Sequence, residues 1–111
     1  MYVGVCRLTL VVPGARSLKD KRTVVRKIKD RAAAKHHVRV AEVGGQDTWQ
    51  RAVLGFAVVS ADRAHVESVV DGVIRFVRGL GVANVISEKR EVLQFEDDDF
   101  EEADWVAGKF E

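Results

Sequence analysis

The sequence YVGVCRLTLVV, residues 2–12, decides the fold of this chain, and it ends at the turn pair Pro13-Gly14. Such a run of β-branched and other apolar residues before a Pro-Gly turn predicts a β-strand. Successive side chains of a strand point to opposite faces of a sheet. One face of this strand would carry Tyr2, Cys6, Leu8, Leu10 and Val12, and the other Val3, Val5 and Val11. Both faces of the sheet are therefore predicted to be rich in apolar residues.

A helix is predicted directly after this strand. Ser17 precedes Leu18, and Asp20 follows three residues later, which resembles a capping box with Asp in place of the usual Glu. The apolar residues then recur at spacings of seven, three and four, as one face of a helix running to about His36 does. That apolar face consists of Leu18, Val25, Ile28 and Ala32. The other faces carry Lys19, Lys21, Arg22, Arg26, Lys27, Lys29, Arg31 and Lys35.

Four more elements are predicted further along the chain. Strands are expected at 38–43, before Gly44-Gly45, and at 51–59, a run with little polar interruption that indicates a central strand. A second helix is expected from an N-cap at Ser60 to Gly79, and a fourth strand at 82–95. The order βαββαβ predicts an α+β protein, a ferredoxin-like sandwich with a four-stranded antiparallel sheet and both helices on one face. Residues 1–95 would form this domain and residues 96–111 an acidic C-terminal tail.

The sheet face without helices needs a partner in this topology. Because both alternating sets of strand residues are apolar-rich, that face would expose a hydrophobic surface, which proteins rarely leave bare to water. We expect either self-association as a homodimer or burial of the face under the C-terminal tail.

The charge of the chain is distributed unevenly. Residues 1–95 carry 17 basic and 9 acidic side chains, whereas residues 96–111 carry 1 basic and 8 acidic side chains, so the near-neutral total hides two charged regions. A focused positive field attracts polyanions, above all the phosphates of nucleic acids. The single cysteine fits a reducing compartment, and no apolar run approaches the ~20 residues that span a bilayer. These features predict a cytoplasmic protein without a membrane association.

Three motifs carry a family resemblance. They are PGARSLKDKR (residues 13–22), AEVGGQDTWQRAVLGFAVVS (residues 41–60) and its continuation SADRAHVE (residues 60–67). These motifs closely resemble the YlxP-like proteins, a small bacterial family classed as a domain of unknown function. The resemblance covers about residues 1–95 and implies a ferredoxin-like fold with no established enzyme activity. Because family members are often encoded among translation and ribosome-maturation genes, it also implies an association with RNA or the ribosome.

The first helix and the loop before it are the predicted nucleic-acid-binding surface. The free N–H groups at a helix start attract anions, and basic side chains surround this one. The hairpin between the second and third strands should lie at the same end of the sheet, so a loop pocket of Ser17, Asp47, Trp49 and Arg51 could hold a phosphate and a stacked base. In the alternative interpretation, Asp47 pairs with Arg16 or Lys19, and Trp49 only anchors the hairpin. The residues predicted to contact phosphates are Arg16, Lys19, Lys21, Arg22, Arg26 and Lys29.

Catalytic and metal-binding chemistry is not indicated. Cys6 alternates with apolar neighbours and is expected to be a buried, inert thiol, and His36, His37 and His65 have no fourth ligand at a suitable spacing. We expect no cofactor, no metal and no catalytic residue. The sequence thus predicts a non-catalytic RNA-binding module. Two alternatives stay open: a module that binds a small phosphorylated ligand or nucleotide at the start of the first helix, which as an enzyme would use Asp47, and a protein–protein interaction module that does not bind nucleic acid.

The tail has two interpretations of its own. It combines many carboxylates with Phe100, Trp105 and Phe110, so it could dock on the basic helix and compete with nucleic acid. It could equally be a disordered, solubilising segment.

Overall fold

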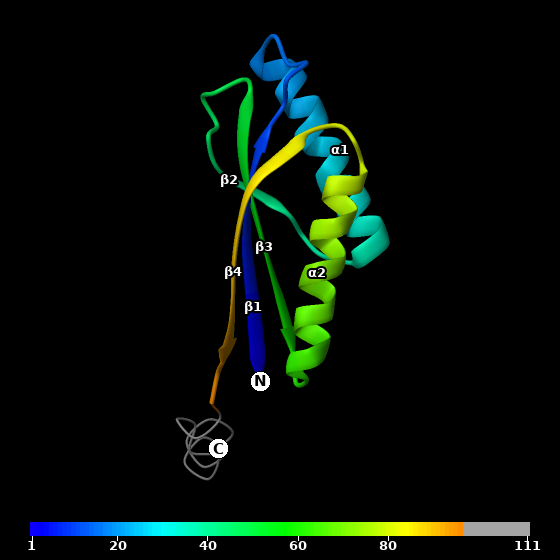
Figure 1. Cartoon of the computed structure of the whole chain (residues 1–111), viewed down its shortest axis with the longest axis vertical. Coiled ribbons are helices and arrows are strands. Elements are labelled where there is room, and N and C mark those ends of the chain that lie inside the picture. Colours follow the sequence, from blue (N-terminus) through cyan, green and yellow to red (C-terminus); the bar gives the residue numbers. More distant parts are fainter. Residues whose placement is uncertain (97–111) are drawn as a thin grey trace, which may run out of the picture.

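The predicted order of strands and helices is observed in the computed structural model, which describes residues 1–96 (Figure 1). The elements are β1 (Tyr2–Val11), α1 (Leu18–His36), β2 (Ala41–Gly44), β3 (Arg51–Ser60), α2 (Arg63–Gly79) and β4 (Asn84–Gln94). The predicted tail at 96–111 lies outside the described residues, apart from Glu96.

The four strands form one antiparallel sheet in the order β2-β3-β1-β4. The strand at 51–60 is therefore central, as its continuous apolar run predicts. Both helices lie on the same side of the sheet in Figure 1. We call the side under the helices the covered face and the other side the open face. This arrangement confirms the predicted α+β, ferredoxin-like sandwich.

Several element boundaries differ from the predictions by one to three residues. Asp62, not Ser60, is the N-cap of α2, and its carboxylate accepts a hydrogen bond from the Ala64 backbone N–H at 2.9 Å. Ser60 instead ends β3, and its hydroxyl accepts from the Asp62 N–H. β2 begins three residues later than predicted, because Val38 and Val40 enter the core before the chain joins the sheet. β4 is shorter at both ends, and its pairing with β1 contains a register shift at Thr9/Leu10.

The hydrophobic core lies between the covered face and the two helices. Its largest fully buried apolar side chains are Leu8, Leu10, Ile28, Leu54, Val66, Val70 and Val73. Gly4 allows α2 to approach β1 closely, since a Cβ at this position would lie 2.5 Å from Cγ1 of Val66. In the middle of β1 and β3 every second residue is buried on the covered face, and the residues between them define the open face.

The helices are too polar or too short for a bilayer. Within residues 1–96, no helix is long and apolar enough to cross a membrane.

Candidate functional site

The outer side of α1 is exposed and carries mostly positive side chains. Lys19, Arg22, Arg26 and Lys29 are all exposed and recur at spacings of three, four and three, which places them in one row along the helix. We call these four residues the outer row. With a rise of ~1.5 Å per residue the outer row spans roughly 15 Å. Within residues 1–96 none of the four forms an ion pair. Their charges are therefore free to meet an anionic partner.

Lys21 does not belong to this surface, and its assignment as a phosphate contact is wrong. Its side chain is only 1% exposed, and its Nζ lies 3.0 Å from Oε2 of Glu42. The same Nζ donates to the backbone carbonyls of Gly45 at 2.6 Å, Gln46 at 3.3 Å and Arg51 at 3.4 Å. A buried ammonium needs such partners, because burying a charge without them is costly. Lys21 thus fastens α1 to the β2–β3 hairpin and cannot reach a ligand outside.

The start of α1 is closed by its own capping residues. Ser17 Oγ accepts from the Asp20 backbone N–H at 3.1 Å, as the predicted N-cap does. Asp20 Oδ2 accepts from the Arg16 N–H at 3.0 Å, one residue before the N–H that a standard capping box uses. The negative charge of the Asp20 carboxylate offsets the partial positive charge at the start of the helix, which would otherwise attract an anion. Arg16 itself remains exposed beside it.

The predicted loop pocket is only partly assembled. The β2–β3 hairpin does lie at the same end of the sheet as the β1–α1 loop, since the Val12 N–H donates to the Gln50 carbonyl at 2.9 Å. No ion pair within residues 1–96 joins Asp47 to Arg16 or Lys19, so the proposed staple is absent and Lys21 serves this purpose. The Trp49 side chain is 46% exposed.

Arg51, the remaining member of the predicted pocket, lies on the open face. It pairs in register with Val11, and its side chain is exposed while its carbonyl accepts from Lys21. The structure therefore does not bring Ser17, Asp47, Trp49 and Arg51 to one point.

The open face has an apolar end and a charged middle. The strand registers define rows across β3, β1 and β4, and the first row is Val59, Val3 and Leu93. The second row is Ala57, Val5 and Glu91, and the third is Gly55, Arg7 and Lys89. Val59 is 60% exposed and Leu93 51% exposed, so the apolar end is open to solvent.

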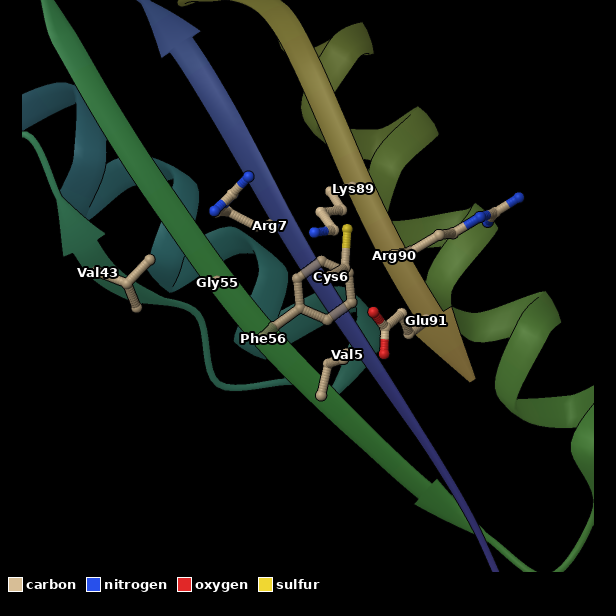
Figure 2. A pocket seen from close by; sticks show the side chains of 9 residues that line it. All are labelled: Val5, Cys6, Arg7, Val43, Gly55, Phe56, Lys89, Arg90 and Glu91. Carbon is tan, nitrogen blue, oxygen red and sulfur yellow. The ribbon is translucent and has the colours of Figure 1, made fainter. Parts of the chain in front are cut away.

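A shallow hollow of about 450 Å³ occupies the middle of the open face (Figure 2). Gly55 contributes no side chain there, and Val43 of β2 and Val5 of β1 border the space. Figure 2 shows Lys89 and Glu91 pointing from β4 toward β1, whereas Arg90 points away toward α2. The hollow thus combines apolar walls with side chains of both charges.

The edge of the sheet beside α2 is held by ion pairs. Arg90 pairs with Asp71, and Arg78 Nη2 lies 3.8 Å from Glu88 Oε1. Beneath them, burial and the nearby Glu88 carboxylate raise the pKa of the Cys6 thiol to about 11, although Arg90 opposes this shift. Because the thiolate is the reactive form, Cys6 is unreactive at neutral pH, as the sequence predicts.

His36, at the C-terminal end of α1, packs against Phe76 of α2. Its ring meets the Phe76 ring edge-on at a centroid distance of 5.2 Å. Burial lowers the pKa of His36, and the positive charges of Lys35 and His37 lower it further. At neutral pH His36 is therefore an uncharged side chain packed against Phe76.

The strand order and the helix placement define a ferredoxin-like α+β protein with an exposed basic helix. The chain belongs to the family described as "Protein of unknown function (DUF503)", which matches residues 3–94. The uncharacterized protein YlxP of Bacillus subtilis (strain 168) is 37% identical over 75 residues, which cover 68% of this chain and 82% of that protein. The resemblance to the YlxP-like family is thus confirmed.

Solved structures support the fold alone. The structural-genomics protein YJCS has a TM-score of 0.50 at 8% identity, covering 83% of this chain and 99% of that one. A VAO-type flavoprotein from Myceliophthora thermophila also has a TM-score of 0.50, at 13% identity, covering 89% of this chain and 17% of that one.

The burial of Lys21 and the hollow on the open face were not predicted from the sequence. The sequence did contain a signal that Lys21 is buried. It lies three residues after Leu18 and four before Val25, which places it on the apolar face of the helix. The hollow on the open face had no comparable signal, since it depends on which residues Gly55 meets across three strands.

Proposed function

We propose that this protein is a non-catalytic RNA-binding module that uses the outer row of α1, with Arg16 at its start, to contact phosphates. The proposal extends to a cytoplasmic, ribosome-associated homodimer that needs no cofactor. One observation carries it: seven Lys and Arg side chains of α1 are exposed, against the two carboxylates Asp20 and Asp30. Those basic residues are Lys19, Arg22, Arg26, Lys27, Lys29, Arg31 and Lys35.

The geometry of the outer row suits a phosphate backbone better than a single small anion. Its side chains are strung along three helical turns at intervals of roughly 5 Å and share one ligand-facing side. Neutralising several phosphates at once gives an affinity that falls steeply with salt and depends little on base sequence. A row of basic side chains can recognise the shape of an RNA double helix and its phosphates, but not its base sequence.

A small phosphorylated ligand at the start of α1 is the less favoured alternative. Ser17 Oγ already accepts from one backbone N–H of that helix end, and the Asp20 carboxylate beside it would repel an anion. An acidic protein surface is the other alternative, and it would use the same outer row without any preference for RNA.

The test is a fluorescence-anisotropy titration of a structured ribosomal RNA fragment across a salt series. We expect wild-type affinity to fall steeply with salt. In Arg22→Glu/Arg26→Glu the affinity should fall at least about 10-fold, and the salt slope should shrink by about two. Arg22→Lys/Arg26→Lys preserves the charge and should bind nearly as wild type does.

A second control distinguishes the effect of where the charge is changed from the effect of the net charge of the chain. Arg63→Glu changes an exposed arginine at the start of α2 by the same charge as Arg22→Glu. We expect only Arg22→Glu to weaken RNA binding substantially. The proposal is overturned if the wild type does not bind at low salt, or if both single variants lose affinity equally. Competition by an acidic protein but not by RNA would favour the interaction module instead.

A further inference from the structure

We propose that the open face of the sheet binds the open face of a second copy of this chain. This inference rests on the homodimer proposed above and names the surface that forms it. RNA binding is not required for it.

The apolar end of the open face needs a cover. Val5, Val59 and Leu93 are 38%, 60% and 51% exposed, and all three lie in the first two rows, beside Val3 and Ala57. A contiguous apolar patch on a sheet, rimmed by charged residues, is typical of a protein interface. Isolated exposed apolar side chains would need no explanation, but these are neighbours in register.

The charges on the two sides of the protein discriminate between possible interfaces. Two copies cannot meet through the outer row of α1, because its exposed side chains are all positive and would repel one another. The open face instead carries both signs, with Glu91 one row from Lys89 on the same strand. A two-fold symmetric interface places the same surface on both copies, so a surface that pairs with itself must hold both charges.

The position of the two-fold axis determines which charged residues of the two copies meet. If the two-fold axis runs across the strands between the second and third rows, the β4 strands of the two copies run antiparallel. Glu91 of one copy then faces the partner's Lys89, and the partner's Glu91 faces Lys89 of the first copy. The partner's Ala57 would then face the hollow over Gly55, and the partner's Val5 would face Arg7. Both ion pairs and apolar contacts form in one arrangement.

The edge of β4 is a poorer interface than the open face. An exposed edge strand can pair with another chain, but Glu88, Lys89, Arg90 and Glu91 put four charged residues in its middle. Arg90 and Glu88 are also engaged with α2. Pairing through the open face leaves these contacts intact.

Pairing through the open face has a consequence for the proposed function. The layers of the dimer would be helix, sheet, sheet and helix, so both copies of α1 stay on the outside. The dimer would offer two outer rows on opposite sides.

The experiment is sedimentation equilibrium of the full chain over a range of concentrations. We expect the wild type to have twice the mass of one chain. Val59→Glu/Leu93→Glu should sediment as a monomer, with its dimer dissociation constant raised about 100-fold or more, because each new carboxylate would be buried against the partner's open face without a counter-charge. Both residues are exposed in the single chain, so circular dichroism should show an unchanged fold.

A charge exchange tests the contact independently of the apolar patch. Lys89→Glu and Glu91→Lys should each weaken self-association, whereas an equimolar mixture of the two variants should associate, because every facing pair then has opposite charges. Arg22→Glu is the matched control on α1 and should leave the dimer mass unchanged.

The outcomes separate this inference from the RNA proposal. A wild-type monomer at ~100 µM would overturn the inference, since specific, stable protein interfaces associate well below that concentration. It would also leave the open face to the chain's own tail or to another protein. A dimer that survives both the apolar and the charge substitutions would overturn it as well. In either case the RNA titration stands, because the outer row lies on the opposite side of the sheet.

Discussion

The two faces of the sheet are formed by the same strands, but their side chains differ in how fully they are buried and paired within one chain. On the covered face, buried side chains fill the space under the helices, and even the buried charge of Lys21 has four oxygen partners. On the open face, apolar residues and charges of both signs remain exposed. The covered face therefore determines whether one chain folds, whereas the open face and the outer row determine what the folded chain meets.

The largest difference is expected when one lysine is replaced on each side of the sheet, Lys21 in the helix layer and Lys89 on the open face. Lys21→Met would leave Glu42 and three carbonyl groups without their cation, so we expect the free energy of unfolding to fall by about 3 kcal/mol. This is the lower end of the range for a broken buried pair, because the Glu42 side chain is 20% exposed. Urea unfolding followed by circular dichroism measures the change.

Lys89→Met is the matched substitution on the open face. Because Lys89 is exposed, the expected change is within about 0.5 kcal/mol. Both variants are measured at low chain concentration, so that association between copies does not contribute. Equal losses in the two variants would contradict the assignment of Lys21 as the fastener of α1.

Lys21 also shows where reading the sequence succeeds and where it stops. The alternation of β1 and the helical spacing of α1 are local patterns, and they were sufficient to predict the element order, the central strand and the covered face. Lys21 occupies an apolar position of that spacing, but its charge placed it in the predicted phosphate surface. Its carbonyl partners lie 24 to 30 residues away in a hairpin, and no local pattern specifies such a contact.

The predicted loop pocket shows the same limit of local sequence patterns. The topology correctly predicts that the hairpin and the β1–α1 loop share one end of the sheet. Which side chains meet there depends on the path of each loop, so neither the pairing of Asp47 nor the place of Arg51 followed from the sequence. The outer row, in contrast, needs only the helical period, and the exposure of Arg22, Arg26 and Lys29 agrees with that prediction.

Two glycines of the central strands give a second, smaller contrast between the faces. In Gly4→Ala the new Cβ would lie 2.5 Å from Val66 Cγ1 and 3.2 Å from Val70 Cγ2, both on buried residues. We expect this overpacking to lower the free energy of unfolding by about 1–3 kcal/mol. Urea unfolding again measures it.

Gly55→Ala is the counterpart on the open face. Its Cβ would lie 3.3 Å from Cγ1 of Val43, a side chain that is 54% exposed and free to move aside. We expect a loss of less than about 1 kcal/mol, since the neighbour can adjust. If Gly55→Ala were the more damaging substitution, the open face would be as tightly constrained within one chain as the covered face.

The smallest expected effect is a pH dependence that arises on the covered side. The pKa of His36 in the folded chain lies below its ordinary value near 6.5, mainly because of burial and also because of Lys35 and His37. As the pH falls below 6.5, His36 binds a proton more readily in the unfolded chain than in the folded chain. The free energy of unfolding should therefore be highest above pH 6.5 and decline as the pH falls toward the pKa of the folded state.

Urea unfolding at pH 7.5 and pH 5.5 measures this decline, and His36→Gln isolates its source. Glutamine does not titrate, so the variant should lose less stability between the two pH values than the wild type does. Carboxylates contribute equally to both proteins and cancel in the comparison. An identical pH dependence in the two proteins would mean that His36 takes up its proton as easily in the folded chain as in the unfolded one. Water would then reach the His36 ring beside Phe76 as it does in the unfolded chain. The burial that distinguishes the covered face from the open face would not include this contact between α1 and α2.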